Sequence, residues 1–218
     1  MEPGNPHHGQ PVLHAGEELP RARAAVILLH GRGASAEDIL GLSDAIELSG
    51  VAWLAPEAAG RVWLPRHFFE PISDNEPWLS SALSVVHELA SAIEQAGIPA
   101  ARTFVGGFSQ GACLSAEYAL RHPRRWGGIF VLSGVSLGPV DDPAAASLRP
   151  DGSFERTPVV VSCGDPDPYF DVPSVRRTAA QFRARGADVR ELLVPGLGHQ
   201  VSDESLEMCR SAIEAALA

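Results

Sequence analysis

Short apolar runs rich in branched side chains recur along the chain. A Gly or a Pro follows each run within two residues, which is where buried strands usually end. Six runs fit this description: residues 25–29, 51–55, 103–105, 129–132, 159–162 and 189–194. We therefore expect six buried β-strands.

Amphipathic helical patterns lie between several of these runs. Residues 79–96 carry apolar side chains at 79, 82, 83, 86, 89, 90 and 93, and steps of three and four return to one helix face. The other predicted helices are 112–120, 174–185 and 202–217. Strands alternating with helices predict an α/β fold in which helices cover both faces of a mostly parallel, twisted sheet.

Two segments, residues 57–78 and 136–157, fit this alternation poorly and are predicted to be loops. The first holds five large apolar side chains: Trp63, Leu64, Phe68, Phe69 and Trp78. Such residues either form a local core or wall a pocket above the carboxyl edge of the sheet. All five are candidate substrate-binding residues.

Composition and charge narrow the class of protein. The chain has 218 residues, of which 45% are hydrophobic, and no linker-like stretch divides it, so we expect a single domain over residues 1–218. With 17 basic and 27 acidic residues the formal charge is −10. A strongly acidic chain repels phosphate backbones, so no nucleic-acid partner is expected.

The cysteines and the N-terminus predict a cytoplasmic protein. Cys113, Cys163 and Cys209 lie about fifty positions apart, which fits neither a disulfide framework nor a paired metal-binding motif. The N-terminus lacks a basic start followed by an apolar run, and the apolar run at residues 24–29 is too short to cross a bilayer. We expect neither secretion nor integral membrane association.

Two Gly-x-Ser-x-Gly pentapeptides compete for the role of nucleophile site, one centred on Ser109 and one on Ser136. A nucleophile elbow needs a strand, a sharp turn that carries the serine, and then a helix. Ser109 lies between the predicted strand 103–105 and the predicted helix 112–120. Prolines follow Ser136 at positions 139 and 143 and disfavour a helix there, so Ser136 is interpreted as a turn residue.

A serine nucleophile needs a histidine base oriented by a carboxylate. Where the serine lies in a nucleophile elbow of a parallel α/β sheet, the chain order is Ser, acid, His. His122 ends the helix after Ser109 and is interpreted as its cap, which leaves His199 as the base. The remaining histidines precede the serine: His7, His8, His14, His30, His67 and His87.

The acid is expected in the loop after strand 159–162. Asp165, Asp167 and Asp171 all lie in this loop, and aspartates are common in loops for turn chemistry alone. The three therefore remain alternatives.

The main-chain amides that stabilise an oxyanion can come from two places. The segment His30-Gly31-Arg32-Gly33 follows strand 25–29, and its glycines let the backbone curl toward a substrate. The N–H groups of Arg32 and Gln110 would then form the oxyanion hole. An ordinary strand-to-helix turn is the alternative interpretation of this segment.

Taken in order along nearly the whole chain, these motifs resemble the phospholipase/carboxylesterase family of the α/β-hydrolases, which includes acyl-protein thioesterases and small bacterial carboxylesterases. The segments that carry the resemblance are residues 29–34 (LHGRGA), 55–56 (AP), 63–65 (WLP), 106–112 (GGFSQGA), 164–167 (GDPD) and 196–199 (GLGH). The resemblance implies an α/β-hydrolase fold with no large separate lid domain, and it implies Asp167 as the acid beside Ser109 and His199.

The sequence departs from this family at two positions. A leucine is frequent in the family where Arg32 stands, and a guanidinium there could favour an anionic substrate. The family usually has Val-Pro about two residues after the acid, whereas residues 172–173 (VP) come four residues after Asp167. Asp165 and Asp171 therefore stay open as the acid.

We expect a serine hydrolase that cleaves a small-molecule carboxylic ester, thioester or lysophospholipid through an acyl-enzyme intermediate, with no cofactor and no metal ion. An acyltransferase on the same fold is one alternative. A ligand-binding homologue that has lost catalysis is another, because fold does not fix function. The sequence is compatible with a homodimer.

Overall fold

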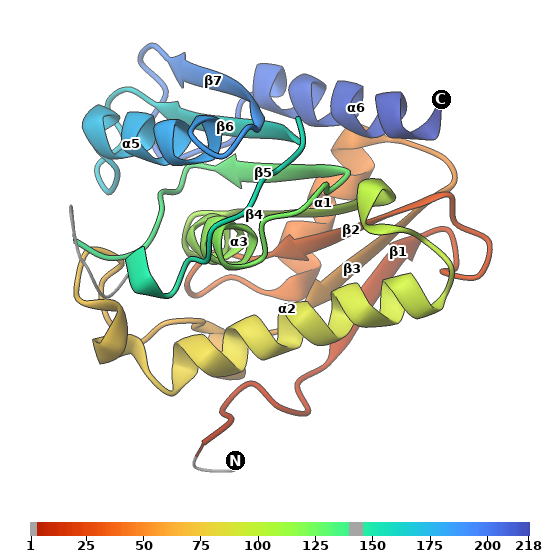
Figure 1. The fold of residues 1–218 in the computed structure, drawn as a ribbon, viewed down its shortest axis with the longest axis horizontal. Helices are drawn as coiled ribbons and strands as arrows, with labels where there is room; N and C mark the ends of the chain where they lie inside the picture. The colour runs from red at the N-terminus through yellow and green to blue at the C-terminus, as the bar shows by residue number, and fades with distance from the viewer. Residues whose placement is uncertain (1–3, 140–145) are drawn as a thin grey trace.

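The computed structural model describes residues 4–139 and 146–218. Its centre is a seven-stranded sheet with the strand order β1-β3-β2-β4-β5-β6-β7 (Figure 1). β1 runs antiparallel to β3, and all other neighbours are parallel. The strands are β1 (Val12–Gly16), β2 (Ala24–Leu29), β3 (Val51–Pro56), β4 (Thr103–Phe108), β5 (Gly128–Leu132), β6 (Pro158–Gly164) and β7 (Asp188–Val194).

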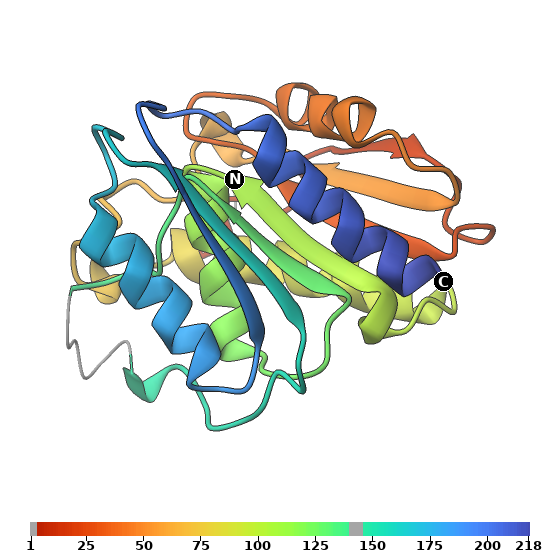
Figure 2. The same cartoon turned by 90° about the horizontal axis from the view of Figure 1, so that it is seen from above.

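Two helical layers cover the sheet (Figure 2). Helices α1 (Ala36–Ile46) and α6 (Asp203–Leu217) pack on one face, where Cys209 and Ile213 of α6 are fully buried. The other face is covered by α2 (Trp78–Gln95), α3 (Gln110–Arg121) and α5 (Val172–Arg183). The prediction of a mostly parallel sheet with helices on both faces is confirmed.

The six predicted strands are all present, and five of them are apolar runs buried on both faces. The prediction of a buried strand at 189–194 is wrong, because β7 lies at the sheet edge and its residues are half-buried or exposed. In β2, Ile27 and Leu29 pack into the layer of α2 and α3, whereas Val26 and Leu28 pack into the layer of α1 and α6. Burial of both faces removes the alternation of polar and apolar positions that a half-exposed strand would show.

Two elements were not predicted. β1 is an edge strand whose residues are half-buried or exposed, so its sequence lacks an apolar run. α1 has a clear N-terminal signal, because Ser35 and Asp38 form a reciprocal capping box, but its buried apolar side chains are few.

The predicted loop at 57–78 contains two short 3₁₀ turns, η1 (Ala59–Arg61) and η2 (Ile72–Asn75), and a third, η3 (Ala100–Arg102), precedes β4. The predicted loop at 136–157 includes residues 140–145, which lie outside the described residues.

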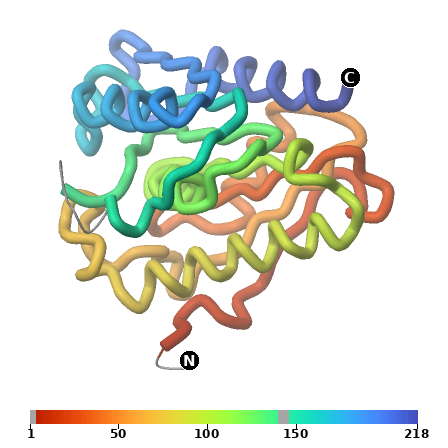
Figure 3. Tube along the Cα trace, in the orientation of Figure 1, coloured from red at the N-terminus to blue at the C-terminus, as the bar shows by residue number. Residues whose placement is uncertain are grey.

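Residues 4–11 lie against α2 before the chain enters the sheet (Figure 3). The His7 N–H donates to the Ser81 hydroxyl of that helix at 2.9 Å. In the part of the chain that the structure describes, no helix combines the length and the apolar character needed to cross a membrane.

Candidate active site

Ser109 lies in a sharp turn between β4 and α3, at the carboxyl edge of the sheet. Its backbone has φ 56° and ψ −119°, a conformation that is costly for a residue with a side chain. The Ser109 N–H donates to the Leu132 carbonyl of β5 at 3.0 Å and helps to hold the turn. A methyl group at Gly107 or Gly111 would collide with the main chain of Leu29, so these glycines allow strand and helix to pack closely.

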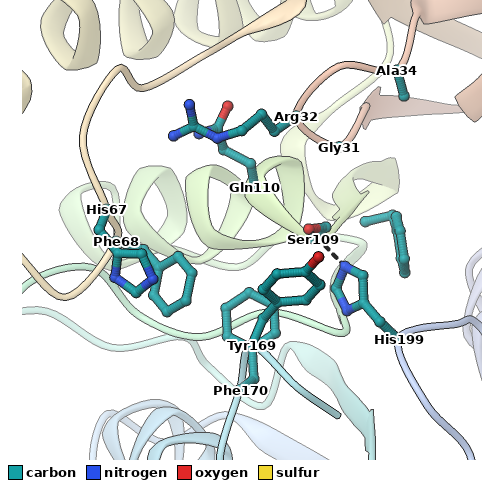
Figure 4. A pocket seen from close by; sticks show the side chains of 11 residues that line it. Gly31, Arg32, Ala34, His67, Phe68, Ser109, Gln110, Tyr169, Phe170 and His199 are labelled. Carbon is teal, nitrogen blue, oxygen red and sulfur yellow. Dashed lines mark hydrogen bonds between the residues drawn. The ribbon is translucent and has the colours of Figure 1, made fainter.

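Ser109, His199 and Asp167 form a hydrogen-bonded chain. The His199 Nε2 lies 2.9 Å from the Ser109 Oγ (Figure 4), and the His199 Nδ1 lies 2.7 Å from the Asp167 Oδ2. An ionised carboxylate only accepts hydrogen bonds, so Nδ1 carries the proton. The Nε2 lone pair of the neutral ring then faces the serine hydroxyl, as a general base requires.

Every oxygen of the Asp167 carboxylate is held in place. Oδ1 accepts the N–H groups of Tyr169 (2.9 Å) and Phe170 (3.3 Å), and Oδ2 accepts the Cys163 thiol (3.4 Å) as well as His199. Burial, with the neighbouring carboxylate, raises the pKa of Cys163 to about 12, so its thiol stays protonated and donates. The carboxylate is fully buried and has one orientation toward the imidazole.

The two other candidate acids bind elsewhere. The Asp165 Oδ1 accepts the Gly196 N–H at 2.8 Å, and the Asp171 Oδ1 accepts the Ser174 N–H at 2.8 Å as the N-cap of α5. Hydrogen bonds from Ser174 lower the pKa of Asp171. Of the three aspartates, Asp167 alone is bonded to His199.

Two main-chain amides beside Ser109 are available to a ligand. Within residues 4–139 and 146–218, neither the Arg32 N–H nor the Gln110 N–H has a hydrogen-bond partner, and both residues line the pocket at Ser109. The Gln110 N–H is also the first amide of α3, where the helix dipole favours negative charge. A Cβ placed at Gly31 would lie 3.4 Å from the Ser109 Cβ, so the two loops approach closely.

The side chains of the same two residues are bonded to the loop after η1. The Gln110 amide accepts from the Trp63 N–H (2.8 Å) and donates to the Leu64 carbonyl (2.9 Å). The Arg32 Nη2 donates to the carbonyls of Leu64 (2.6 Å) and Arg66 (3.0 Å). The loop thus fixes both segments that carry the free amides.

Two buried histidines form hydrogen bonds to the main chain in and next to this loop. The His30 Nδ1 donates to the Gly31 carbonyl (2.8 Å) and its Nε2 accepts the Ala58 N–H (3.0 Å). The His7 Nδ1 accepts the Ala59 N–H (3.1 Å) and its Nε2 donates to the Trp63 carbonyl (3.0 Å). Each ring therefore needs to be neutral, and burial lowers the pKa of both histidines.

We expect the free energy of unfolding to fall as the pH drops from about 7.5 to 5. The pKa values of His7, His30 and His122 are lowered in the folded state, chiefly by burial, so the unfolded chain binds more protons below pH 6.5. Their contribution is complete above that pH and is lost as the pH falls toward the folded-state values. Urea unfolding at several pH values measures this loss.

A matched pair of variants isolates the contribution of His7. His7→Gln should lower the free energy of unfolding at pH 7.5 by about 1–3 kcal/mol, because the Ala59 N–H and the Trp63 carbonyl lose their imidazole partner. It should also flatten the pH dependence of that free energy. His8→Gln, at the exposed neighbouring position, should change neither. An unchanged pH dependence in His7→Gln would contradict this account.

The pocket at Ser109 has a volume of about 340 Å³ and mostly apolar walls. Phe68, Tyr169 and Phe170 (Figure 4), together with Phe108, form these walls. The Phe68 and Phe170 rings contact each other with centroids 4.5 Å apart. The remaining lining residues are Gly31, Arg32, Ala34, His67, Ser109, Gln110 and His199. Such a cavity suits an apolar group of modest size.

Of the five candidate substrate-binding residues, the structure places only Phe68 on the pocket wall. Trp63 and Leu64 are fully buried in the core, and the Trp63 indole N–H donates to the His30 carbonyl at 3.0 Å. Phe69 packs edge-on against Phe68 at 4.6 Å, and Trp78 contacts the His7 ring at 5.2 Å. These four residues support the loop rather than line the cavity.

Sequence reasoning missed several residues of the pocket wall. Phe108 directly precedes the serine, and Tyr169 and Phe170 follow the acid by two and three positions. Adjacency to the reacting residues was the signal that could have found them.

Among the described residues, no group of three or more His, Cys, Asp or Glu side chains is arranged to hold a metal ion.

Comparison with known proteins identifies the family. Residues 13–217 match the family model for phospholipases and carboxylesterases. The chain belongs to this family. This membership, together with the sheet and its helical layers, confirms both the resemblance and the α/β-hydrolase fold, and no separate lid domain is present in the described part of the chain.

Individual relatives are similar over different lengths. A phospholipase/carboxylesterase structure from Dyadobacter fermentans is 36% identical, with a TM-score of 0.88, over 95% of this chain and 97% of that chain. Acyl-protein thioesterase 1 of Neurospora crassa is 29% identical over 62% of this chain and 54% of its own length. For acyl-protein thioesterase 1 of Gibberella zeae the values are 31%, 56% and 51%. The chain thus spans about half the length of these two thioesterases.

Proposed function

We propose that this protein is a serine hydrolase that cleaves carboxylic esters, thioesters included, through an acyl-enzyme intermediate. The observation that carries the proposal is the chain of hydrogen bonds from Asp167 through His199 to Ser109. It ends in a pocket beside two amides that have no hydrogen-bond partner among the described residues. A nucleophile, a base, an orienting carboxylate and oxyanion donors are the parts that acyl transfer requires.

In the first half of the reaction, the Ser109 Oγ attacks the carbonyl carbon while the His199 Nε2 takes the hydroxyl proton. The carbonyl oxygen becomes an oxyanion, and the N–H groups of Arg32 and Gln110 donate to it. His199 then gives its proton to the leaving alcohol or thiol as the bond from the acyl carbon to that group breaks. The acyl group remains bonded to Ser109.

In the second half, water takes the place of the alcohol. His199 accepts a proton from the water as its oxygen attacks the acyl carbon, and the same two amides stabilise the second oxyanion. Collapse breaks the bond to Ser109, whose oxygen regains the proton from His199. Asp167 stabilises the imidazolium in both halves without becoming protonated.

The substrate class rests on the pocket and on the family. Apolar walls of Phe68, Phe108 and Phe170 suit an acyl chain, and relatives carry the names acyl-protein thioesterase and carboxylesterase. A cytoplasmic location remains part of the proposal, supported by three cysteines that are unpaired and buried.

Product analysis tests the proposal. We expect the wild-type protein to release p-nitrophenol and butyrate in equal amounts from p-nitrophenyl butyrate, and to release butyrate from a butyryl thioester. Excess glycerol should divert little of the acyl group. Recovery of most of it as a glycerol ester would identify an acyltransferase, and absence of any release would indicate a binding protein.

A further inference from the structure

The pocket carries two basic side chains at the end remote from the base. Arg32 and His67 lie on the opposite side of Ser109 from His199 (Figure 4). The Arg32 Nη2 donates to the carbonyl of Arg66, the residue before His67, so the two residues are linked through the main chain of this loop. Both side chains are exposed to solvent.

The Arg32 guanidinium is fixed in orientation but has donors to spare. Its two hydrogen bonds, to the Leu64 and Arg66 carbonyls, both use Nη2. Within the described residues, Nε and Nη1 have no hydrogen-bond partner and Arg32 forms no ion pair, so three N–H donors remain. A preoriented guanidinium loses little entropy when it binds an anion.

His67 supplies a further donor at this end of the pocket. Its Nδ1 accepts the Phe69 N–H at 3.4 Å, which leaves the proton on Nε2. The neutral ring can therefore donate from Nε2, and the protonated ring adds a positive charge.

No carboxylate on the pocket wall competes for these donors. The lining contains Arg32, His67 and His199 but no Asp or Glu, although the whole chain carries a formal charge of −10. Glu57 lies near the Arg32 turn but does not line the pocket. Its Oε2 accepts the Ala36 N–H, and its Oε1 lies 3.8 Å from the Arg61 Nε. An anion at this end of the pocket therefore meets two basic side chains and no carboxylate of the pocket wall.

The proposed reaction determines which part of the substrate reaches these groups. The leaving oxygen must lie near the His199 Nε2, because that atom gives it a proton. The acyl chain then extends away from His199, toward the part of the pocket that Phe68, His67 and Arg32 line (Figure 4).

We propose that the preferred acyl group ends in a carboxylate, so that the substrates are monoesters of dicarboxylic acids whose free carboxylate binds Arg32, at the end of the pocket that His67 also lines. This inference rests on the proposed ester hydrolysis. Charge-assisted hydrogen bonds of this kind are about twice as strong as neutral ones.

Matched substrates test the inference. Monoethyl esters of succinic to suberic acid are compared with the ethyl esters of the corresponding monoamides, which are neutral and of nearly equal shape, by measuring ethanol release. For the preferred chain length, the wild type should show a kcat/KM for the acid that exceeds that for the amide by about tenfold or more. Added salt should reduce this ratio.

Variants assign the ratio to its source. The acid-to-amide ratio should fall to about one in Arg32→Met, remain mostly intact in Arg32→Lys and fall partly in His67→Gln. In Arg66→Met, whose side chain does not line the pocket, the ratio should not change. A ratio, taken within one variant, cancels any general loss of activity caused by a disturbed loop.

The outcomes separate this inference from the proposed function. Hydrolysis of the amide esters with a wild-type ratio near one at every chain length overturns the inference and leaves the hydrolase standing. A high ratio that persists in Arg32→Met also overturns it. Absence of hydrolysis of any ester overturns the proposed function and the inference with it.

Discussion

Asp167→Asn should lower kcat for p-nitrophenyl butyrate by about 10⁴-fold, the scale of this substitution in a serine protease triad. The carboxylate accepts the Nδ1 proton of His199 at 2.7 Å. An asparagine presents either a donor or a weaker acceptor at this position, so the imidazole loses the tautomer that leaves Nε2 free to accept the Ser109 proton. Steady-state kinetics at pH 7.5 measures the loss.

The two neighbouring aspartates provide matched controls. Asp171→Asn should retain activity within a few-fold, because asparagine caps a helix about as well as aspartate. Asp165→Asn should also remain within a few-fold, because its contact is to the Gly196 amide and not to the imidazole. If either control lost more activity than Asp167→Asn, the assignment of the acid would be wrong.

Most of the fold could be predicted from the sequence because most strands are buried on both faces. Such strands appear as unbroken apolar runs, and helices of the larger layer carry regular apolar spacing. β1 could not be predicted in this way, because its stability comes from main-chain pairing with β3 at the sheet edge rather than from burial of its own side chains. α1 was missed although its capping box at Ser35 and Asp38 is local and visible in the sequence.

The candidate site was predictable where local structure determines it. A strand, a glycine-flanked serine and a helix point to Ser109, and chain order points to His199. The choice among Asp165, Asp167 and Asp171 depends on which carboxylate faces the imidazole, and that is a property of the folded loop.

The pocket wall was the least predictable part. Trp63 and Phe68 lie in the same aromatic loop, yet Trp63 is fully buried and Phe68 lines the cavity. The direction in which each side chain points is decided by tertiary bonds, such as that from the Trp63 indole to the His30 carbonyl. The composition and the spacing of residues do not predict such contacts.

Ser109→Ala should reduce kcat for p-nitrophenyl butyrate by roughly 10⁴-fold or more, because it removes the atom that becomes acylated. Ser136→Ala in the second pentapeptide is the matched control. The Ser136 side chain is buried beside Thr178, and we expect its loss to leave activity within a few-fold. Comparable losses in the two variants would indicate a structural cause.

The site of covalent modification tests the role of Ser109 most directly. A fluorophosphonate probe should inactivate the wild-type protein, and mass spectrometry of the digested protein should find one adduct per chain, on Ser109. The adduct should be absent from Ser109→Ala. An adduct on another residue of the inactivated protein, or full activity in Ser109→Ala, would contradict the account.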